Sequence, residues 1–173
     1  MSRVLISPYS AVLETVRRHR PSHLLTLMVD PYVETPDGIA PERHLRLHIH
    51  DIVEPAEGTV CPSPSHIGEL LAFARSWDRE QPLLVHCWAG ISRSTAAAFV
   101  VLCDIHGPGH ELTLARALRF HAPHAHPNRA LVRHADDALG RQGRMIAAVE
   151  AMGEARQVWE GEVVELPLSL DEL

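Results

Sequence analysis

One stretch, residues 82–102, constrains the fold more than any other part of the chain. It begins with an apolar run over residues 82–86, continues with a loop of small and polar residues, and ends in a helix-forming run from Arg93. A strand, a tight loop and a helix in this order form the building block of parallel sheets. The stretch therefore predicts an α/β fold with this loop at the carboxyl end of a strand.

Shorter patterns extend the predicted sheet. Residues 4–7, 23–29 and 44–50 have the apolar or alternating character of strands. Helices are expected over 11–19 (with Ser10 as a cap), from Ser63 or Ser65 to 77, and over 93–105, 111–121, 128–139 and 144–157. We expect a single domain over residues 1–173, with a central, mostly parallel sheet of about four or five strands and helices on both faces. The patterns predict no structure for the tail, residues 158–173.

The loop at residues 87–92 has the features of an anion-binding site. The first N–H groups of a helix have no partners within it, and the helix dipole places partial positive charge there. A loop bent around that end can direct several backbone N–H groups at one point. Cys87 opens the loop in a field that favours its thiolate, which is the nucleophilic form. Arg93 closes it, and a guanidinium can bind two phosphate oxygens at once.

Three neighbouring residues are expected to support this site. Gly90 lies mid-loop, where the backbone must approach a ligand closely or take a positive φ. The Ser94 hydroxyl could hydrogen-bond the sulfur when it leaves as a thiolate, and His86 could hold the loop through its ring nitrogens. The plain alternative is a buried structural cysteine in an ordinary strand–helix turn, but such a turn needs neither the glycine nor the arginine at these spacings.

The segment HCWAGISRST resembles the signature of the protein tyrosine phosphatase superfamily, His-Cys-x-x-Gly-x-x-Arg-Ser/Thr, at every fixed position. With small residues around its glycine and arginine, at positions 89–94, the segment most resembles the signature of the compact dual-specificity branch. The resemblance implies that Cys87 attacks phosphorus to form a cysteinyl-phosphate, and that no metal or other cofactor is needed. It also implies that the phosphoryl oxygens are bound by the backbone N–H groups of Trp88, Ala89, Gly90, Ile91, Ser92 and Arg93.

In this superfamily a carboxylic acid on another loop usually protonates the leaving oxygen. Asp51 directly follows the predicted strand at residues 44–50, so it should lie at the same edge of the sheet. Its position, 36 residues before the cysteine, is near the spacing usual in compact members. Asp51 would act as an acid first and as a base afterwards. Glu54, Glu57 and Asp30 are alternatives, and Asp51 could instead cap a turn or face water.

The pair Pro127-Asn128 is similar to a Pro-Asn pair that many superfamily members carry before a helix beneath the phosphate loop. Asn128 is also a good helix cap by itself, and this structural role is the one we expect. The glutamine that positions water in the family has no clear counterpart in this sequence.

The loop has no basic residue between Cys87 and Arg93, and the net charge is −6. Superfamily members that prefer inositol phospholipids usually have lysines there, so the sequence disfavours a lipid substrate, and the acidic balance disfavours nucleic acid. The resemblance implies hydrolysis of phosphotyrosine, with phosphoserine or phosphothreonine as further substrates. Trp88, Tyr32 or a residue of the Asp51 loop could line the cleft. The alternatives are a phosphatase for small metabolites or sugar phosphates, and a non-catalytic module that binds phosphorylated partners.

The cysteine content and the apolar stretches bear on the compartment of the protein, and the arginine content bears on the kind of genome that encodes it. Three cysteines, an odd and low number, do not suggest a disulfide framework. The N-terminal apolar run is short for a signal peptide, and no apolar stretch is long enough to span a bilayer, so we expect a cytoplasmic protein without a membrane partner. All 16 basic residues are arginine, which together with many alanines and histidines suggests a GC-rich bacterial genome.

The chain has 13 histidines, and some of them are grouped in the sequence. The groups are His44, His48 and His50 on one predicted strand, and His121, His124 and His126 in one loop. Histidines at such spacings can bind zinc, but no cysteine or carboxylate completes a tetrahedral set. We therefore expect surface or supporting histidines and no metal.

Overall fold

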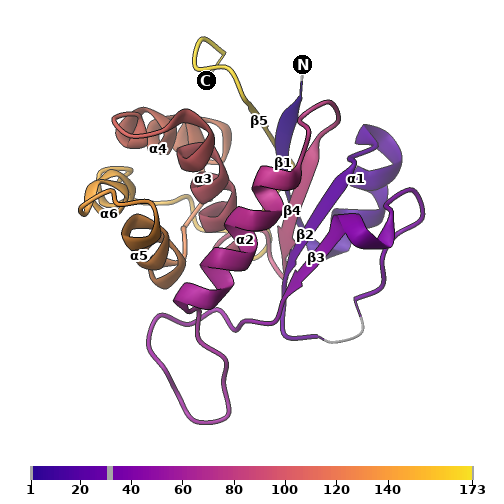
Figure 1. Cartoon of the computed structure of the whole chain (residues 1–173), viewed down its shortest axis with the longest axis horizontal. Coiled ribbons are helices and arrows are strands. Elements are labelled where there is room, and N and C mark those ends of the chain that lie inside the picture. The colour runs from indigo at the N-terminus through magenta and orange to yellow at the C-terminus, as the bar shows by residue number, and fades with distance from the viewer. Residues whose placement is uncertain (1, 31–32, 173) are drawn as a thin grey trace.

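The computed structural model describes residues 2–30 and 33–172 and has a five-stranded sheet between layers of helices (Figure 1). The strands are β1 (Arg3–Pro8), β2 (His23–Leu27), β3 (His44–Leu47), β4 (Leu83–Cys87) and β5 (Val164–Pro167). Their order is β3-β2-β4-β1-β5, with β1 to β4 parallel and β5 antiparallel to β1. The prediction of a mostly parallel sheet is therefore confirmed.

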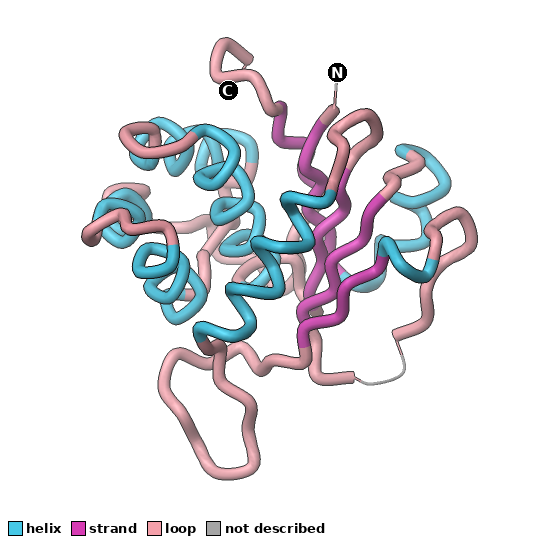
Figure 2. Tube along the Cα trace, viewed as in Figure 1, coloured by secondary structure: helices cyan, strands magenta, loops and turns pink. Residues whose placement is uncertain are grey.

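Helices cover both faces of this sheet, as predicted, but unequally (Figure 2). Helix α1 (Val12–His19) lies on one face, after a 3-10 turn at Tyr9–Ala11. The opposite face carries α2 (Pro64–Ser76), α3 (Arg93–His106), α4 (Glu111–His121), α5 (Arg129–Ala138) and α6 (Arg144–Glu150). A second 3-10 turn, Pro41–Arg43, precedes β3. Two separate clusters of buried apolar side chains follow from this arrangement, a small one under α1 and a large one on the other face.

Helix α3 is the central helix of the larger layer. Every residue from Arg93 to Cys103 is buried, because the helix packs against the sheet on one side and against α4 and α5 on the other. A helix that is apolar all round needs such an environment. The three consecutive alanines, Ala96 to Ala98, have short side chains that allow close packing. The start of α3, and with it the end of the preceding loop, is therefore fixed in the core.

Strand β3 is shorter than the sequence pattern predicts. The alternation over residues 44–50 predicts a strand to His50, but β3 ends at Leu47. After Leu47 the chain turns: the Ile49 N–H donates to the Leu47 carbonyl at 3.1 Å, and the His50 N–H donates to the Val60 carbonyl at 2.8 Å. These bonds take the chain out of the sheet and into the long loop before α2, which extends beyond the carboxyl ends of the strands (Figure 1).

The ends of two helices also differ from the predictions. The helix expected over 144–157 ends at Glu150, and Gly153 then takes a left-handed φ of +73°. Ser10 does not cap α1, because its hydroxyl donates to Glu160 at 2.5 Å, 150 residues away in sequence. The predicted caps of α2 and α5 are present: Ser63 forms a capping box, and Asn128 accepts from two backbone N–H groups.

The tail contains the fifth strand. Val164 and Leu166 of β5 are buried in the large core cluster, while β5 pairs with β1 through residues 3–6. A four-residue edge strand has too short a pattern to stand out in a sequence, and Pro167 at its end is typical of an edge position.

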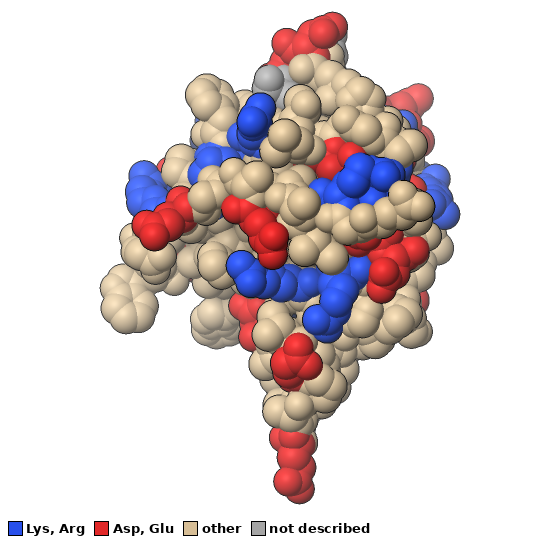
Figure 3. Space-filling view, turned by 90° about the vertical axis from the view of Figure 1, so that its left-hand side faces the viewer, with Lys and Arg blue, Asp and Glu red and all other residues tan. Residues whose placement is uncertain are grey.

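On the face formed by α4 to α6, the described basic and acidic side chains are interspersed (Figure 3).

Candidate active site

The loop at residues 87–93, here called the phosphate loop, joins β4 to α3 at the carboxyl ends of the parallel strands. Cys87 is the last residue of β4 and only 2% exposed. Its Sγ lies 3.2 Å from the Ser94 Oγ, in the first turn of α3. The structure thus brings together the predicted nucleophile and the hydroxyl expected to stabilise it.

The carbonyl groups at the start of the phosphate loop accept hydrogen bonds from two segments that are far apart in sequence. The Trp88 carbonyl accepts from the Tyr9 N–H at 3.0 Å, directly after β1. The Ala89 carbonyl accepts from the Gly161 N–H at 2.8 Å, just before β5. These bonds turn the carbonyl oxygens away from the centre of the loop.

The second half of the phosphate loop is fixed in the same way. The His126 N–H donates to the Ile91 carbonyl at 2.9 Å, and the Asn128 N–H donates to the Ser92 carbonyl at 3.2 Å. The Thr95 hydroxyl donates to both of these carbonyls, at 2.6 and 3.0 Å. By contrast, the amide N–H groups of residues 88–92 donate to no acceptor within the described residues. A loop in which the carbonyls of Trp88, Ala89, Ile91 and Ser92 are bonded and the amides are free is suited to bind an anion.

Gly90 is required by the fold as well as by the loop. Its φ is +69°, a conformation that glycine adopts without strain. A Cβ at this position would lie 2.7 Å from the Pro8 N and 2.9 Å from the Ser7 carbonyl carbon. The positive φ was one of the two alternatives predicted for this glycine, the other being a close approach to a ligand. The structure shows a close approach to the backbone at the end of β1.

Arg93 is 8% exposed, and one nitrogen of its guanidinium group already donates a hydrogen bond within the protein. Its Nη1 donates to the Ile49 carbonyl at 2.9 Å, just after β3. Its Nε is buried and has no hydrogen-bond partner among the described residues. A buried donor without a partner is costly and rare, and at this place it indicates a site for an oxyanion.

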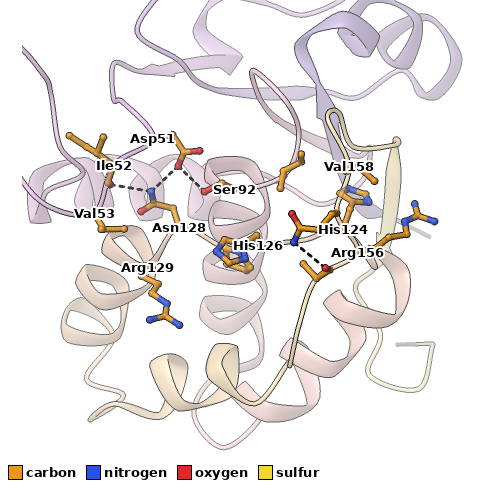
Figure 4. Close-up of a pocket in the computed structure, with 14 residues that line it drawn as sticks. Asp51, Ile52, Val53, Ser92, His124, His126, Asn128, Arg129, Arg156 and Val158 are labelled. Carbon is orange, nitrogen blue, oxygen red and sulfur yellow. Dashed lines mark hydrogen bonds between the residues drawn. The ribbon is translucent and has the colours of Figure 1, made fainter.

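Asp51 lies at the edge of the phosphate loop and is held there by two side chains (Figure 4). The Ser92 Oγ donates to its Oδ1 at 2.7 Å, and the Asn128 Nδ2 donates to the same oxygen at 2.9 Å. Asn128 Nδ2 also lies 3.1 Å from the Ile52 carbonyl. Asn128 therefore does more than cap α5, which sequence reasoning missed. The Pro-Asn pair was the only signal of this second role.

The alternative acids are less well placed. The Glu54 side chain is 76% exposed and 3.8 Å from the Arg133 Nη1, so it is directed towards α5. Glu57 is exposed in the same long loop, and Asp30 is exposed after β2. Asp51, by contrast, contacts the phosphate loop directly through Ser92. Tyr32, a predicted cleft residue, lies outside the described residues.

His86 is completely buried behind the phosphate loop. Its Nε2 lies 2.6 Å from the Thr26 Oγ1 of the neighbouring strand. Burial, helped by the nearby Arg93, lowers the pKa of His86 to about 4, so the ring is neutral near pH 7. The Tyr9 ring stacks on His86 and also on Trp88, with centroid separations of 5.9 Å in both pairs. Trp88 is 64% exposed, but it is not among the residues that line the cleft beside Asp51, whereas Ile52 and Val53 of the Asp51 loop are.

An open cleft of about 630 Å³ adjoins the phosphate loop (Figure 4). It lies between the Asp51 loop, the second half of the phosphate loop, the start of α5 and residues 155–158. Its walls include Arg129, Arg156 and Gln157, which sequence reasoning did not single out. They come from segments far apart in sequence and from outside the motif, so no local pattern marks them.

The remaining candidates from the sequence are histidines and cysteines. Within residues 2–30 and 33–172, no three His, Cys, Asp or Glu side chains form a group that could hold a metal ion. His44 and His124 are buried, so of the two expected roles, surface or supporting, these two histidines are not on the surface. Cys61 is half-buried, and burial raises the pKa of the Cys103 thiol.

None of the described helices is both long and apolar enough to cross a membrane.

No protein-family model matches the sequence, and no curated protein is significantly similar to it. Solved structures with the same fold do exist. The crystal structure of DUSP15 has a TM-score of 0.61 and 20% sequence identity, over 89% of this chain and 99% of that chain. Human DUSP28 has a TM-score of 0.60 and 19% identity, over 87% of this chain and 95% of that chain.

A third similar structure is the human tyrosine phosphatase-like serine/threonine/tyrosine-interacting protein. Its TM-score is 0.57 at 19% identity, over 79% of this chain and 95% of that chain. The chain therefore has the fold of the protein tyrosine phosphatases. Within that class, its fold is that of the compact dual-specificity members, as the resemblance of the HCWAGISRST segment implies.

Proposed function

We propose that the protein is a phosphatase that hydrolyses phosphate monoesters through a cysteinyl-phosphate intermediate on Cys87. The observation that carries the proposal is the environment of the Cys87 sulfur. It lies at the base of a loop whose amide N–H groups, together with the buried Nε of Arg93, lack acceptors within the described residues. A bound phosphoryl group supplies the oxygens that these donors need.

In the first step, the Cys87 thiolate attacks phosphorus, an S–P bond forms and the bond from phosphorus to the ester oxygen breaks. The loop amides and Arg93 stabilise the charge on the three remaining phosphoryl oxygens. Asp51 gives its proton to the leaving oxygen. Both hydrogen bonds to Asp51 are accepted by Oδ1, so the transferred proton is the one on Oδ2.

In the second step, water attacks the phosphorus of the cysteinyl-phosphate. Asp51, now a carboxylate, takes a proton from that water, and the S–P bond breaks to release phosphate. The sulfur leaves as a thiolate. The Ser94 hydroxyl, 3.2 Å away, donates a hydrogen bond to it and makes it a better leaving group.

The cleft beside Asp51 favours a protein substrate. It is open and adjoins the position where the leaving group departs, so it can accept a peptide chain that carries phosphotyrosine. Phosphoserine and phosphothreonine also fit a shallow site. The competing assignment is a small-metabolite phosphatase, which would not need a cleft of this extent.

The test is turnover of an aryl phosphate by the purified protein in the presence of EDTA. Wild type should release phosphate, and Cys87→Ser should release none. Cys61→Ser, at the half-buried cysteine in the Asp51 loop, is the matched control and should keep wild-type activity. Activity that survives in Cys87→Ser would refute the mechanism.

A substrate panel then separates the candidate functions. It should contain phosphotyrosine, phosphoserine and phosphothreonine peptides, sugar phosphates and a phosphoinositide. We expect the highest kcat/KM on phosphotyrosine peptides. Binding of phosphopeptides without any turnover would instead indicate a non-catalytic module.

A further inference from the structure

One carbonyl group of the phosphate loop differs from its neighbours. The carbonyls of residues 88, 89, 91 and 92 accept backbone N–H bonds, whereas the Gly90 carbonyl accepts none from the described residues. In a planar trans peptide, the C=O and the N–H of the next residue point in opposite directions. The orientation of the Gly90 carbonyl therefore sets the direction of the Ile91 N–H, which is one of the donors proposed for phosphate.

The peptide group between Gly90 and Ile91 is also the one that local structure restrains least. A glycine has no Cβ to limit its torsion angles, so this peptide can rotate more freely than the others in the loop. A rotation that turned the Gly90 carbonyl inward would place a second oxygen against the bound oxyanion. A donor from outside the loop is needed to hold this carbonyl outward.

The imidazole ring of His124 lies beside the Gly90 carbonyl. A Cβ built on Gly161 would be 2.6 Å from the His124 Nε2 and 2.9 Å from the Gly90 oxygen, so both atoms border the same small space. The ring is 2% exposed, and neither of its nitrogens has a partner of normal geometry within the described part of the chain. Figure 4 shows His124 at the end of the cleft that carries Arg156 and Val158.

The backbone on both sides of His124 is held in place by two arginines. The Arg119 Nη1 donates to the Pro123 carbonyl at 2.8 Å and to the Ala125 carbonyl at 2.9 Å. The Arg156 N–H donates to the Pro123 carbonyl as well, also at 2.8 Å. A side chain that emerges from such a segment is directed by the fold rather than by chance, as a positioning group requires.

One tautomer of His124 matches this place. Burial lowers its pKa, Arg156 and Arg119 lower it further, and Glu162 and the Gly90 carbonyl oppose them, so the ring is neutral near pH 7. A neutral imidazole has one N–H and one lone pair. A lone pair on Nε2 would be repelled by the carbonyl oxygen, so the proton is on Nε2.

We propose that His124 is a positioning residue that donates its Nε2–H to the Gly90 carbonyl and thereby directs the Ile91 N–H towards the phosphate. The inference rests on the proposed function, because it concerns the phosphate loop of that site. It assigns a role to a side chain from the loop between α4 and α5, outside the HCWAGISRST segment.

The direct test is the affinity for inorganic phosphate, measured by titration calorimetry. His124→Leu removes the donor at similar size and should weaken binding about tenfold, the effect of one hydrogen bond. His124→Gln keeps an N–H donor and should retain most of the affinity. His121→Leu is the matched control, because the buried Nε2 of His121 also has no partner among the described residues. It should bind phosphate as the wild type does.

A measurement on the wild type keeps the test decisive if His124→Leu does not fold. Long-range ¹H–¹⁵N spectra should show a neutral His124 ring with its proton on Nε2. Addition of phosphate should shift the Ile91 amide resonance, and this shift should be smaller in a folded His124→Leu. A proton on Nδ1, wild-type affinity in a folded His124→Leu, or an equal loss in His124→Gln would overturn the inference.

Phosphate binding requires no hydrolysis, so the two proposals fail in different ways. Without the proposed function, no phosphate ester would be turned over, yet the affinity for phosphate would still respond to His124→Leu. Without the positioning role of His124, turnover by the wild type would be normal and the affinity would not respond.

Discussion

Asp51 accepts two hydrogen bonds on one carboxylate oxygen, Oδ1, which leaves Oδ2 for the proton transfer that we propose. We expect Asp51→Asn to reduce kcat roughly 10²–10⁴-fold, because an amide accepts these bonds but cannot protonate the leaving oxygen. The affinity for inorganic phosphate should not change. Steady-state kinetics with a phosphotyrosine peptide, together with phosphate titration, measure both quantities.

Glu54→Gln is the matched control for this experiment. Glu54 is a carboxylate of the same loop, and it forms an exposed ion pair with Arg133. Its amide variant should retain wild-type kcat. A large loss in Glu54→Gln together with a mild effect in Asp51→Asn would reassign the acid.

Gly90 combines a left-handed backbone with a close approach to the end of β1. Gly90→Ala should therefore lower the free energy of unfolding by more than the roughly 1–2 kcal/mol that a left-handed φ costs an alanine. Gly140 has a similar φ of +63°, but a Cβ added there would meet no atom within 4 Å, so Gly140→Ala should show the backbone cost alone. Urea unfolding compares the two. Equal losses would mean that the contact with Pro8 is unimportant.

The residues at the centre of the site could be predicted because they are close in sequence. Cys87, Arg93 and Ser94 belong to one motif, and the structure places the cysteine and the serine in contact. The partners that come from afar could not be predicted. The Ile49 carbonyl that binds Arg93 and the amide of Asn128 that binds Asp51 are brought to the site only by the packing of the sheet and α5.

At the level of elements, the start of α5 is joined to the site through Asn128. Its Oδ1 accepts from the N–H groups of Ala130 and Leu131, while its Nδ2 donates to Asp51. Asn128→Asp keeps the cap but places a second carboxylate against Asp51. We expect the helix cap to be retained and kcat to be at least tenfold lower for this variant.

Asn128→Ala removes both functions and completes the comparison. It should lose about 1 kcal/mol of stability through the missing cap, in addition to the loss of kcat. Thermal melts and steady-state kinetics of the two variants separate the structural role from the positioning role. If Asn128→Asp turned over at the wild-type rate, the bond to Asp51 would have no part in catalysis.

The elements that the sequence predicted well are those with long, regular patterns. Helix α4 begins and ends where expected, and α3 ends one residue later than expected, at the Gly107-Pro108-Gly109 breaker. The errors lie where long-range contacts override a local pattern. The bond from His50 to Val60 ends β3 early, and β5 becomes a strand only because β1 is available to pair with it.

For the whole molecule, buried neutral histidines predict acid sensitivity. The folded-state pKa of His44 and of His86 is about 4, below the ordinary value of 6.5. Between these values the unfolded chain binds protons that the folded chain does not, so the free energy of unfolding falls as the pH falls from 6.5 towards 4. Each histidine contributes on the order of 1 kcal/mol per pH unit in this window.

Thermal melts between pH 7 and pH 5 test this expectation, and Tm should fall steadily below pH 6.5. His44→Gln should flatten the profile, whereas the substitution His48→Gln, at an exposed histidine, should not. A Tm that is constant over this range would show that the buried rings are protonated without cost.

The two backbone bonds to Trp88 and Ala89 are donated by Tyr9 and Gly161, which are widely separated in sequence. A polypeptide still emerging from the ribosome has the first of these donors long before the second. The sulfur of Cys87, the nucleophile that we propose, would thus gain its full surroundings only after residue 161 has been synthesised. Newly made protein would become competent to act late, when the rest of the domain has already assembled around it.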